Sequence, residues 1–347
     1  MCPTSEEQIQ FLVNLQRLLN ELLFVASYKF ALLLALADLS VENGDDSAAT
    51  LSISTEAIAE KFVQYYWRQA VPYPAVAGAR VLKQNTGRQA AILNKVMRSR
   101  EQHGDSLTRL MKQRGSWSRL VRRVARVVEG MPLWKLQTVG SERLDFLYKN
   151  VHRGRTIELR SGVAFCFRKF HALIVDLVHG AWVRYIRQQN LSILGEATDL
   201  NSFFFGSERA VLSAARPTLM EIQHGQCFYC RAALSPASTH VDHFVPWARY
   251  PVDLGHNLVL ADSRCNAQKS DRLPAYYHLA TWVQRNVRHG DQIAEALEKC
   301  GVAAQLDVSK RITQWAYAQS EAAGGLTWLR GDEMVPLVEH WRLLLAS

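Results

Sequence analysis

Side chains that could hydrolyse a phosphodiester bond are concentrated between residues 227 and 271. This window reads Cys-Phe-Tyr-Cys at 227–230, His-Val-Asp-His-Phe-Val-Pro at 240–246, Asn-Leu-Val-Leu at 257–260 and Cys-Asn-Ala-Gln-Lys-Ser-Asp at 265–271. Such hydrolysis needs an activated water, neutralised charge on the phosphate and assistance for the leaving oxygen. A histidine, a carboxylate, amides and a lysine in one short window could meet these needs.

Asp242 and His243 form the centre of this window. A neutral histidine can accept a proton from water near physiological pH. Neighbouring side chains on an ideal strand point to opposite faces, so the strand must twist or end here for both groups to act on one substrate. His240 would share a strand face with Asp242, and it could be either a further metal ligand or an ordinary strand histidine.

Cys227 and Cys230 have the spacing of a zinc knuckle, in which a tight turn presents two thiolates. Downstream, Cys265 supplies a third thiolate, and Asp262 stands where a fourth cysteine is usual. Zinc accepts carboxylate oxygen, so these four residues could close a structural zinc site. Either His224 or His240 could replace Asp262 as the fourth ligand. Three buried cysteines without a metal ion are the alternative interpretation.

The order of these residues resembles the HNH endonuclease motif, and the window is similar to the HNH domain of the RNA-guided CRISPR nucleases. The resemblance implies that His243 is the general base and that Asp242 and Asn266 bind one divalent ion, Mg²⁺ or Mn²⁺. Asparagine replaces the last histidine of the motif, and its harder amide oxygen suits magnesium. Asn257 would hold the loop and orient the base, although alone it could equally be a turn residue after Gly255.

Several basic residues could contact nucleic-acid phosphates. Lys269 lies one helical turn beyond Asn266 and could reach a phosphate next to the scissile one, as could Arg264 and Arg249. Residues 107–128 carry seven basic side chains and no acidic one. In the second half of that segment, apolar residues fall on one helical face, and four arginines fall on the opposite face: Arg119, Arg122, Arg123 and Arg126. This stripe could bind phosphates or be an ordinary solvated face.

The composition favours a cytoplasmic protein with a polyanionic partner. The formal net charge is +9, which suits DNA but would also suit an anionic membrane surface. Three of the six cysteines lie in the window and three are scattered, unlike a disulfide framework. The N-terminus lacks the layout of a signal peptide, and the apolar run at 30–37 is far shorter than the roughly 20 residues of a membrane-spanning helix. We therefore expect no membrane insertion.

Helical periodicity in most of the chain predicts a mainly α, multidomain protein, and the resemblance implies a small α+β HNH nuclease domain of the ββα-metal type. Residues 1–105 are expected to form a helical domain. Residues 106–205 are expected to hold the basic helix, a small β-hairpin and a long helix, as a DNA-binding or regulatory region. The nuclease domain would span 206–275, followed by a helical region at 276–347. The hairpin is predicted at 155–168, where apolar residues alternate around a turn at Ser161-Gly162.

These features together predict a metal-dependent HNH endonuclease that nicks or cuts DNA. The resemblance to HNH proteins implies a restriction or anti-phage defence system, whose other proteins could be partners. An RNA-cleaving nuclease or toxin is one alternative, because the same site would cleave either backbone. A catalytically idle zinc-knuckle module that binds nucleic acid is the other. The presence of Asp242, His243, Asn257 and Asn266 together favours the enzyme.

Overall fold

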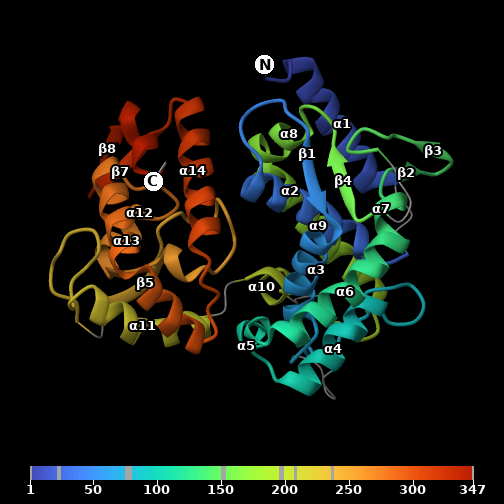
Figure 1. Ribbon diagram of the computed structural model, residues 1–347, viewed down its shortest axis with the longest axis horizontal. Helices are drawn as coiled ribbons and strands as arrows, with labels where there is room; N and C mark the ends of the chain where they lie inside the picture. The colour runs from blue at the N-terminus through green and yellow to red at the C-terminus, as the bar shows by residue number, and fades with distance from the viewer. Residues whose placement is uncertain are drawn as a thin grey trace. The chain divides into compact units, whose positions relative to one another are not determined.

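The computed structural model describes residues 2–21, 25–74, 80–149, 154–194, 199–206, 209–235 and 238–345, with only the backbone described at 21 and 209–211. The chain divides into two compact units, Met1–Gly206 and Ser207–Ser347 (Figure 1). Helices dominate both units, and the strands pair into two-stranded sheets. The expected mainly α protein with a small α+β region is confirmed, whereas the boundaries expected at 105 and 275 stay predictions. None of the described helices is long and apolar enough to cross a bilayer.

The first unit is built around a helix that is buried along most of its length, α2. The elements follow in this order: α1 (Ser5–Glu21), α2 (Tyr28–Asn43), β1 (Leu51–Ser54), α3 (Thr55–Gln69), α4 (Ala91–His103), α5 (Leu107–Lys112), α6 (Arg114–Gly130), α7 (Pro132–Lys135), β2 (Thr138–Val139), β3 (Glu142–Arg143), β4 (Thr156–Leu159), α8 (Val163–Lys169), α9 (His171–Gln189) and α10 (Leu200–Phe205). All residues from Phe30 to Glu42 are buried, where α2 packs against α3, α8 and α9. A helix that is apolar on all sides is expected in such a central position.

The hairpin predicted at 155–168 is only half correct. Its first half is strand β4, which pairs antiparallel with β1 so that Leu159 lies opposite Leu51. The second half is helix α8, which buries Val163 and Phe167 at helical spacing. Gly162 supplies the turn between them with a φ of +79°. The prediction failed because a short apolar run fits a buried strand and a buried helix equally well.

The basic segment at 107–128 forms two helices, α5 and α6, which meet at Gln113. On α6, Leu120, Val121 and Val124 are buried, as the apolar face required. The four arginines of the predicted stripe are exposed on the opposite side: Arg119, Arg122, Arg123 and Arg126. The segment is therefore an amphipathic helix with a cationic outer face.

The second unit contains a strand pair followed directly by a short helix, β5-β6-α12. Its elements are α11 (Arg209–Ile222), β5 (Thr239–His243), η2 (Gly255–Asn257), β6 (Leu258–Asp262), α12 (Ser263–Lys269), α13 (Tyr276–Lys299), α14 (Leu306–Ala322), β7 (Leu326–Arg330), β8 (Glu333–Pro336) and η3 (Glu339–Leu344). Strands β5 and β6 are antiparallel, with Asp242 opposite Val259. Leu258 and Leu260 of β6 pack in a core with apolar residues of α11 and α13.

The end of β6 is also the beginning of α12. The carboxylate of Asp262 accepts a hydrogen bond from the backbone N–H of Cys265, at 2.9 Å, and so caps the helix. This cap places Cys265 and Asn266 in the first turn of α12, directly behind the strand pair. A strand pair followed by a capped helix therefore forms the framework that positions the residues of the sequence window.

Candidate functional site

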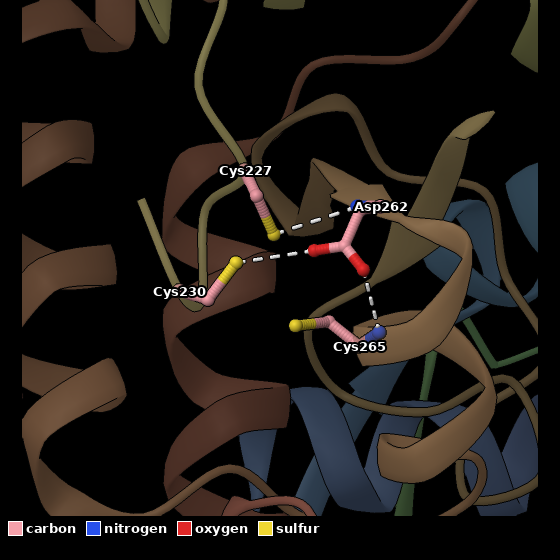
Figure 2. Close-up of side chains that lie close together, drawn as sticks. All are labelled: Cys227, Cys230, Asp262 and Cys265. Carbon is pink, nitrogen blue, oxygen red and sulfur yellow. Dashed lines mark hydrogen bonds between the residues drawn. The ribbon is translucent and has the colours of Figure 1, made fainter. Parts of the chain in front are cut away.

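Three thiols and one carboxylate gather at the end of the ββα unit where α12 begins, and we call Cys227, Cys230, Asp262 and Cys265 the cysteine cluster. Figure 2 shows their sulfur and carboxylate atoms around a common space. The ligand atoms all lie within 4.8 Å of one another. Neither His224 nor His240 belongs to this group of described residues. Three sulfurs and one oxygen at such separations could bind a tetrahedral zinc ion.

Hydrogen bonds hold the turn of the cysteine cluster against β6. The backbone N–H of Cys227 donates to Ala232 at 2.8 Å, and that of Phe228 donates to Leu260 at 2.9 Å. Arg231 closes the turn with a φ of +64°, in the left-handed region. Cys230 Sγ donates to Asp262 Oδ2 at 3.2 Å (Figure 2). The turn therefore presents its thiols to the carboxylate at the end of β6.

Two of the thiols and the carboxylate of the cysteine cluster have pKa values that are shifted in opposite directions. Burial, assisted by the nearby Asp262 carboxylate, raises the pKa of Cys227 to about 11 and raises the pKa of Cys265 further. Burial opposes ionisation of Asp262, but hydrogen bonds from the cysteines outweigh it and hold the pKa of that carboxyl well below its usual range. Binding of a metal ion would therefore have to displace the thiol protons.

A second site is an open pocket of about 400 Å³ between α11, β5 and α12. Its polar lining is contributed by six residues: Ser213, Arg216, His240, Asp242, His243 and Asn266. The pocket thus brings together Asp242, His243 and Asn266, which the sequence motif singled out. It also places the exposed His240 beside them. We call this site the pocket.

The carboxylate of Asp242 is held by two donors. The hydroxyl of Tyr229 donates to its Oδ2 at 2.6 Å, and the ammonium of Lys269 lies 3.2 Å from Oδ1 and 3.0 Å from Oδ2. Burial raises the pKa of Tyr229 well above its usual range, and the charge of Asp242 adds to this rise. Tyr229 therefore stays protonated and donates to Asp242.

The phosphate contact expected of Lys269 is wrong. Its side chain is fully buried and donates to the backbone oxygen of His243 at 2.8 Å as well as to Asp242. Burial lowers the pKa of Lys269, and the Asp242 carboxylate opposes this change. The reason is geometric: α12 packs on β5, so the position one turn beyond Asn266 faces the strand and its carboxylate rather than solvent.

The imidazole of His243 is held by Asp253, a residue that the sequence reasoning missed. His243 Nε2 lies 2.8 Å from Asp253 Oδ1, and the His243 side chain is largely buried. An ionised carboxylate only accepts hydrogen bonds, so Nε2 carries a proton and Nδ1 is the basic nitrogen of the neutral ring. Nothing in the spacing distinguishes Asp253 from other loop acids, because its role arises from the fold of the loop after β5.

Asn257 holds the loop that leaves β5, as the motif implied, but it does so through the backbone of Val245. Its Oδ1 accepts from Val245 N at 2.8 Å, and its Nδ2 donates to Val245 O at 3.0 Å. The expected orientation of the base comes from a different residue, since Asp253 holds the His243 imidazole. Asn257 thus lies behind the pocket rather than in its lining.

Arg216 of α11 is a further pocket residue that the sequence reasoning missed. Its Nε is buried and has no hydrogen-bond partner among the described residues. The only signal in the sequence was an arginine on an amphipathic helix just before the window, which is too common to identify a site. Of the other expected phosphate contacts, Arg264 is exposed and Arg249 is half-buried, and neither lines the pocket.

Comparison with known proteins gives one family. Residues 227–275 match the family model described as HNH endonuclease. The matched segment begins at the first cysteine of the cluster and includes β5, β6 and α12. No curated protein and no solved structure matches the chain. The cysteine cluster and the ββα unit agree with this match, and the segment 227–275 belongs to the HNH endonuclease superfamily.

Proposed function

We propose that the protein is a metal-dependent endonuclease that hydrolyses phosphodiester bonds in DNA, by nicking or by double-strand cleavage. One observation carries this proposal: a single pocket brings a carboxylate, an imidazole and an amide of the HNH segment together with the guanidinium of Arg216, which precedes that segment. A module that only bound nucleic acid would need the cations but not Asp242, His243 and Asn266 together. The combination therefore favours catalysis over an idle binding site.

Asp242 and Asn266 are the residues that would hold a divalent ion, Mg²⁺ or Mn²⁺. Both line the pocket, and carboxylate and amide oxygens are the hard ligands that these ions prefer. A carboxylate offers about four lone-pair sites, so Tyr229 and Lys269 leave Asp242 able to accept a further partner. A bound ion would supply positive charge to the scissile phosphate and the leaving oxygen. His240, at the same pocket, could add a nitrogen ligand.

His243 would act as the general base. With Nε2 held by Asp253, its Nδ1 can accept a proton from the attacking water, and the carboxylate then stabilises the imidazolium that forms. The ring of Trp247 lies 5.2 Å from that of His243, in a tilted arrangement. The His243–Asp253 pair thus provides the two properties that a base needs, a defined tautomer and a fixed orientation.

Arg216 would bind the phosphate in place of Lys269. A guanidinium presents several N–H donors in one plane, which match the oxygens of a phosphate. Its Nε has no other hydrogen-bond partner among the described residues, and the side chain lines the same pocket as His243. Arg216 therefore supplies the permanent positive charge that the pocket would otherwise lack.

The cysteine cluster would hold a structural zinc ion that supports the start of α12.

The exposed arginines of α6 would contact DNA phosphates without reading sequence. If each of the four binds one phosphate, replacing them all with glutamine should reduce the salt dependence of binding by about 3.6 in log K per log salt. By family-level analogy we place the enzyme in restriction or anti-phage defence, with other proteins of such a system as partners.

The direct experiment is cleavage of supercoiled plasmid DNA and of RNA with Mg²⁺, with Mn²⁺ and with EDTA. The wild-type protein should convert the plasmid to nicked or linear forms only with a divalent ion, and His243→Ala should not. Equal cleavage by both proteins would show that His243 is not the base. Cleavage of RNA alone would replace the proposed substrate, and no cleavage of either nucleic acid would contradict the enzyme itself.

A further inference from the structure

Tyr229 links the cysteine cluster to the pocket. It lies inside the turn between Cys227 and Cys230, yet its hydroxyl donates to the Asp242 carboxylate at 2.6 Å. Tyr229 lies two residues after Cys227 and one residue before Cys230, and it thus contacts the carboxylate that would hold the divalent ion. The conformation of that turn and the orientation of Asp242 are therefore connected by one hydrogen bond.

The ring of Tyr229 is fixed on three sides by other rings. Its centroid lies 5.2 Å from those of Phe228, His278 and Trp328, all in nearly perpendicular arrangements. His278 belongs to α13 and Trp328 to β7, beyond the matched segment 227–275. His278 Nε2 donates to the backbone oxygen of Leu329 at 2.7 Å, which anchors this cage in turn. Edge-to-face ring contacts of this kind restrict both torsions of the tyrosine.

The second donor to Asp242 also depends on the cysteine cluster. Lys269 lies on α12, whose first turn contains Cys265 and is capped by Asp262. Both groups that hold Asp242 therefore project from segments that carry cluster ligands. A metal ion shared by the turn and α12 would fix these two segments relative to each other, and with them the phenol and the ammonium.

We propose that Tyr229 is a positioning residue that holds the Asp242 carboxylate in the orientation that binds the divalent ion. Through this hydrogen bond, the ordering of the cysteine cluster and of the downstream segments α13 and β7 also fixes the orientation of Asp242. This inference rests on the proposed function, because it takes Asp242 as a ligand of that ion. Ligating carboxylates are themselves hydrogen-bonded in proteins, and loss of such a partner typically lowers metal affinity about 10–100-fold.

The test compares Tyr229→Phe with Tyr317→Phe in the full chain loaded with zinc. Both changes keep a buried ring and remove one hydroxyl, and each hydroxyl makes a 2.6 Å hydrogen bond, to Asp242 for Tyr229 and to the backbone oxygen of Pro274 for Tyr317. Calorimetric titration with Mn²⁺ in the absence of nucleic acid, with Asp242→Ala as the reference for a lost ligand, reports metal affinity directly.

Tyr229→Phe should weaken Mn²⁺ binding about 10–100-fold and leave the zinc content unchanged. The Mg²⁺ concentration for half-maximal cleavage should rise in parallel, while the rate at saturating Mg²⁺ largely recovers. Tyr317→Phe should bind Mn²⁺ as the wild type does. Unchanged Mn²⁺ affinity in Tyr229→Phe, or an equal loss in Tyr317→Phe, would overturn the positioning role and leave the proposed nuclease intact. If Asp242→Ala binds Mn²⁺ like the wild type, the ligand assignment itself fails.

Discussion

The cysteine cluster and the pocket share one ββα unit but are built in opposite ways. In the cluster, the ligand atoms face one another within 4.8 Å and form a closed donor set. In the pocket, Asp242 and His243 are each tied back to the protein, through Tyr229, Lys269 and Asp253, and the space in front of them is open. A closed set of ligands is typical of a metal ion that stabilises the fold. Fixed side chains around an open space are typical of a site that binds a substrate. The comparison predicts that changes in the two regions have different consequences.

The largest effect is expected when the base loses its carboxylate. Asp253→Asn keeps the shape of the side chain but removes the charge that fixes the His243 tautomer and stabilises the imidazolium. Single-turnover cleavage should slow by roughly 10²–10⁴-fold, with thermal stability and zinc content close to those of the wild type. A rate within twofold of the wild type would show that the hydrogen bond seen between these residues has no catalytic importance.

Arg216→Ala should have the next largest effect. Loss of a preorganised donor to a developing phosphate charge typically costs about 10²–10³-fold in rate. The matched control is Arg288→Ala, which removes an exposed arginine of α13 that does not line the pocket. Cleavage by the control should be unchanged. If both variants cut DNA equally well, the pocket does not use Arg216 for the phosphate.

Asp262→Asn should affect the closed site and spare the open one. Asparagine caps a helix about as well as aspartate, so α12 keeps its N-terminal hydrogen bond. The anionic ligand is lost, and competition with a chelator should show zinc affinity lower by about tenfold or more. Cleavage at saturating zinc should stay near that of the wild type. Unaltered zinc affinity would exclude Asp262 as the fourth ligand.

The smallest effect is expected at Asn257, which supports the pocket from behind. Asn257→Ala leaves the buried N–H and C=O of Val245 without their side-chain partner. Unsatisfied groups of this kind cost about 1–3 kcal/mol each, which corresponds to a fall of several degrees in the melting temperature of a unit this size. Calorimetric unfolding measures this directly. A larger loss of activity at temperatures where the protein is folded would assign Asn257 a role in the chemistry.

The same comparison explains how much the sequence could predict. The cysteine cluster was predictable because each half is local: Cys227 and Cys230 share one turn, and Asp262 and Cys265 share one helix cap. The strand pair and α12 were implied by the resemblance of the same window to the HNH motif. Each half of the cluster depends on contacts between residues close in the chain, which spacing encodes directly.

The support of the pocket was not predictable, because it depends on contacts between distant residues. In the sequence alone, Lys269 cannot be distinguished from a solvent-facing helical lysine. Only the packing of α12 on β5 shows that it is buried. Tyr229, Asp253 and Arg216 have no distinguishing spacing, and each acquires its role from a neighbour that only the fold supplies. The order of residue types thus located the chemistry, whereas the groups that position it came from tertiary packing.

We propose that one ββα unit carries two different metal sites, one closed and one catalytic. The most direct measurement is anomalous diffraction from crystals of the zinc-loaded protein soaked in Mn²⁺, recorded at the absorption edges of both metals. We expect a zinc peak within the cysteine cluster and a separate manganese peak between Asp242 and Asn266. A manganese peak absent from the pocket, or present only at the cysteine cluster, would contradict it.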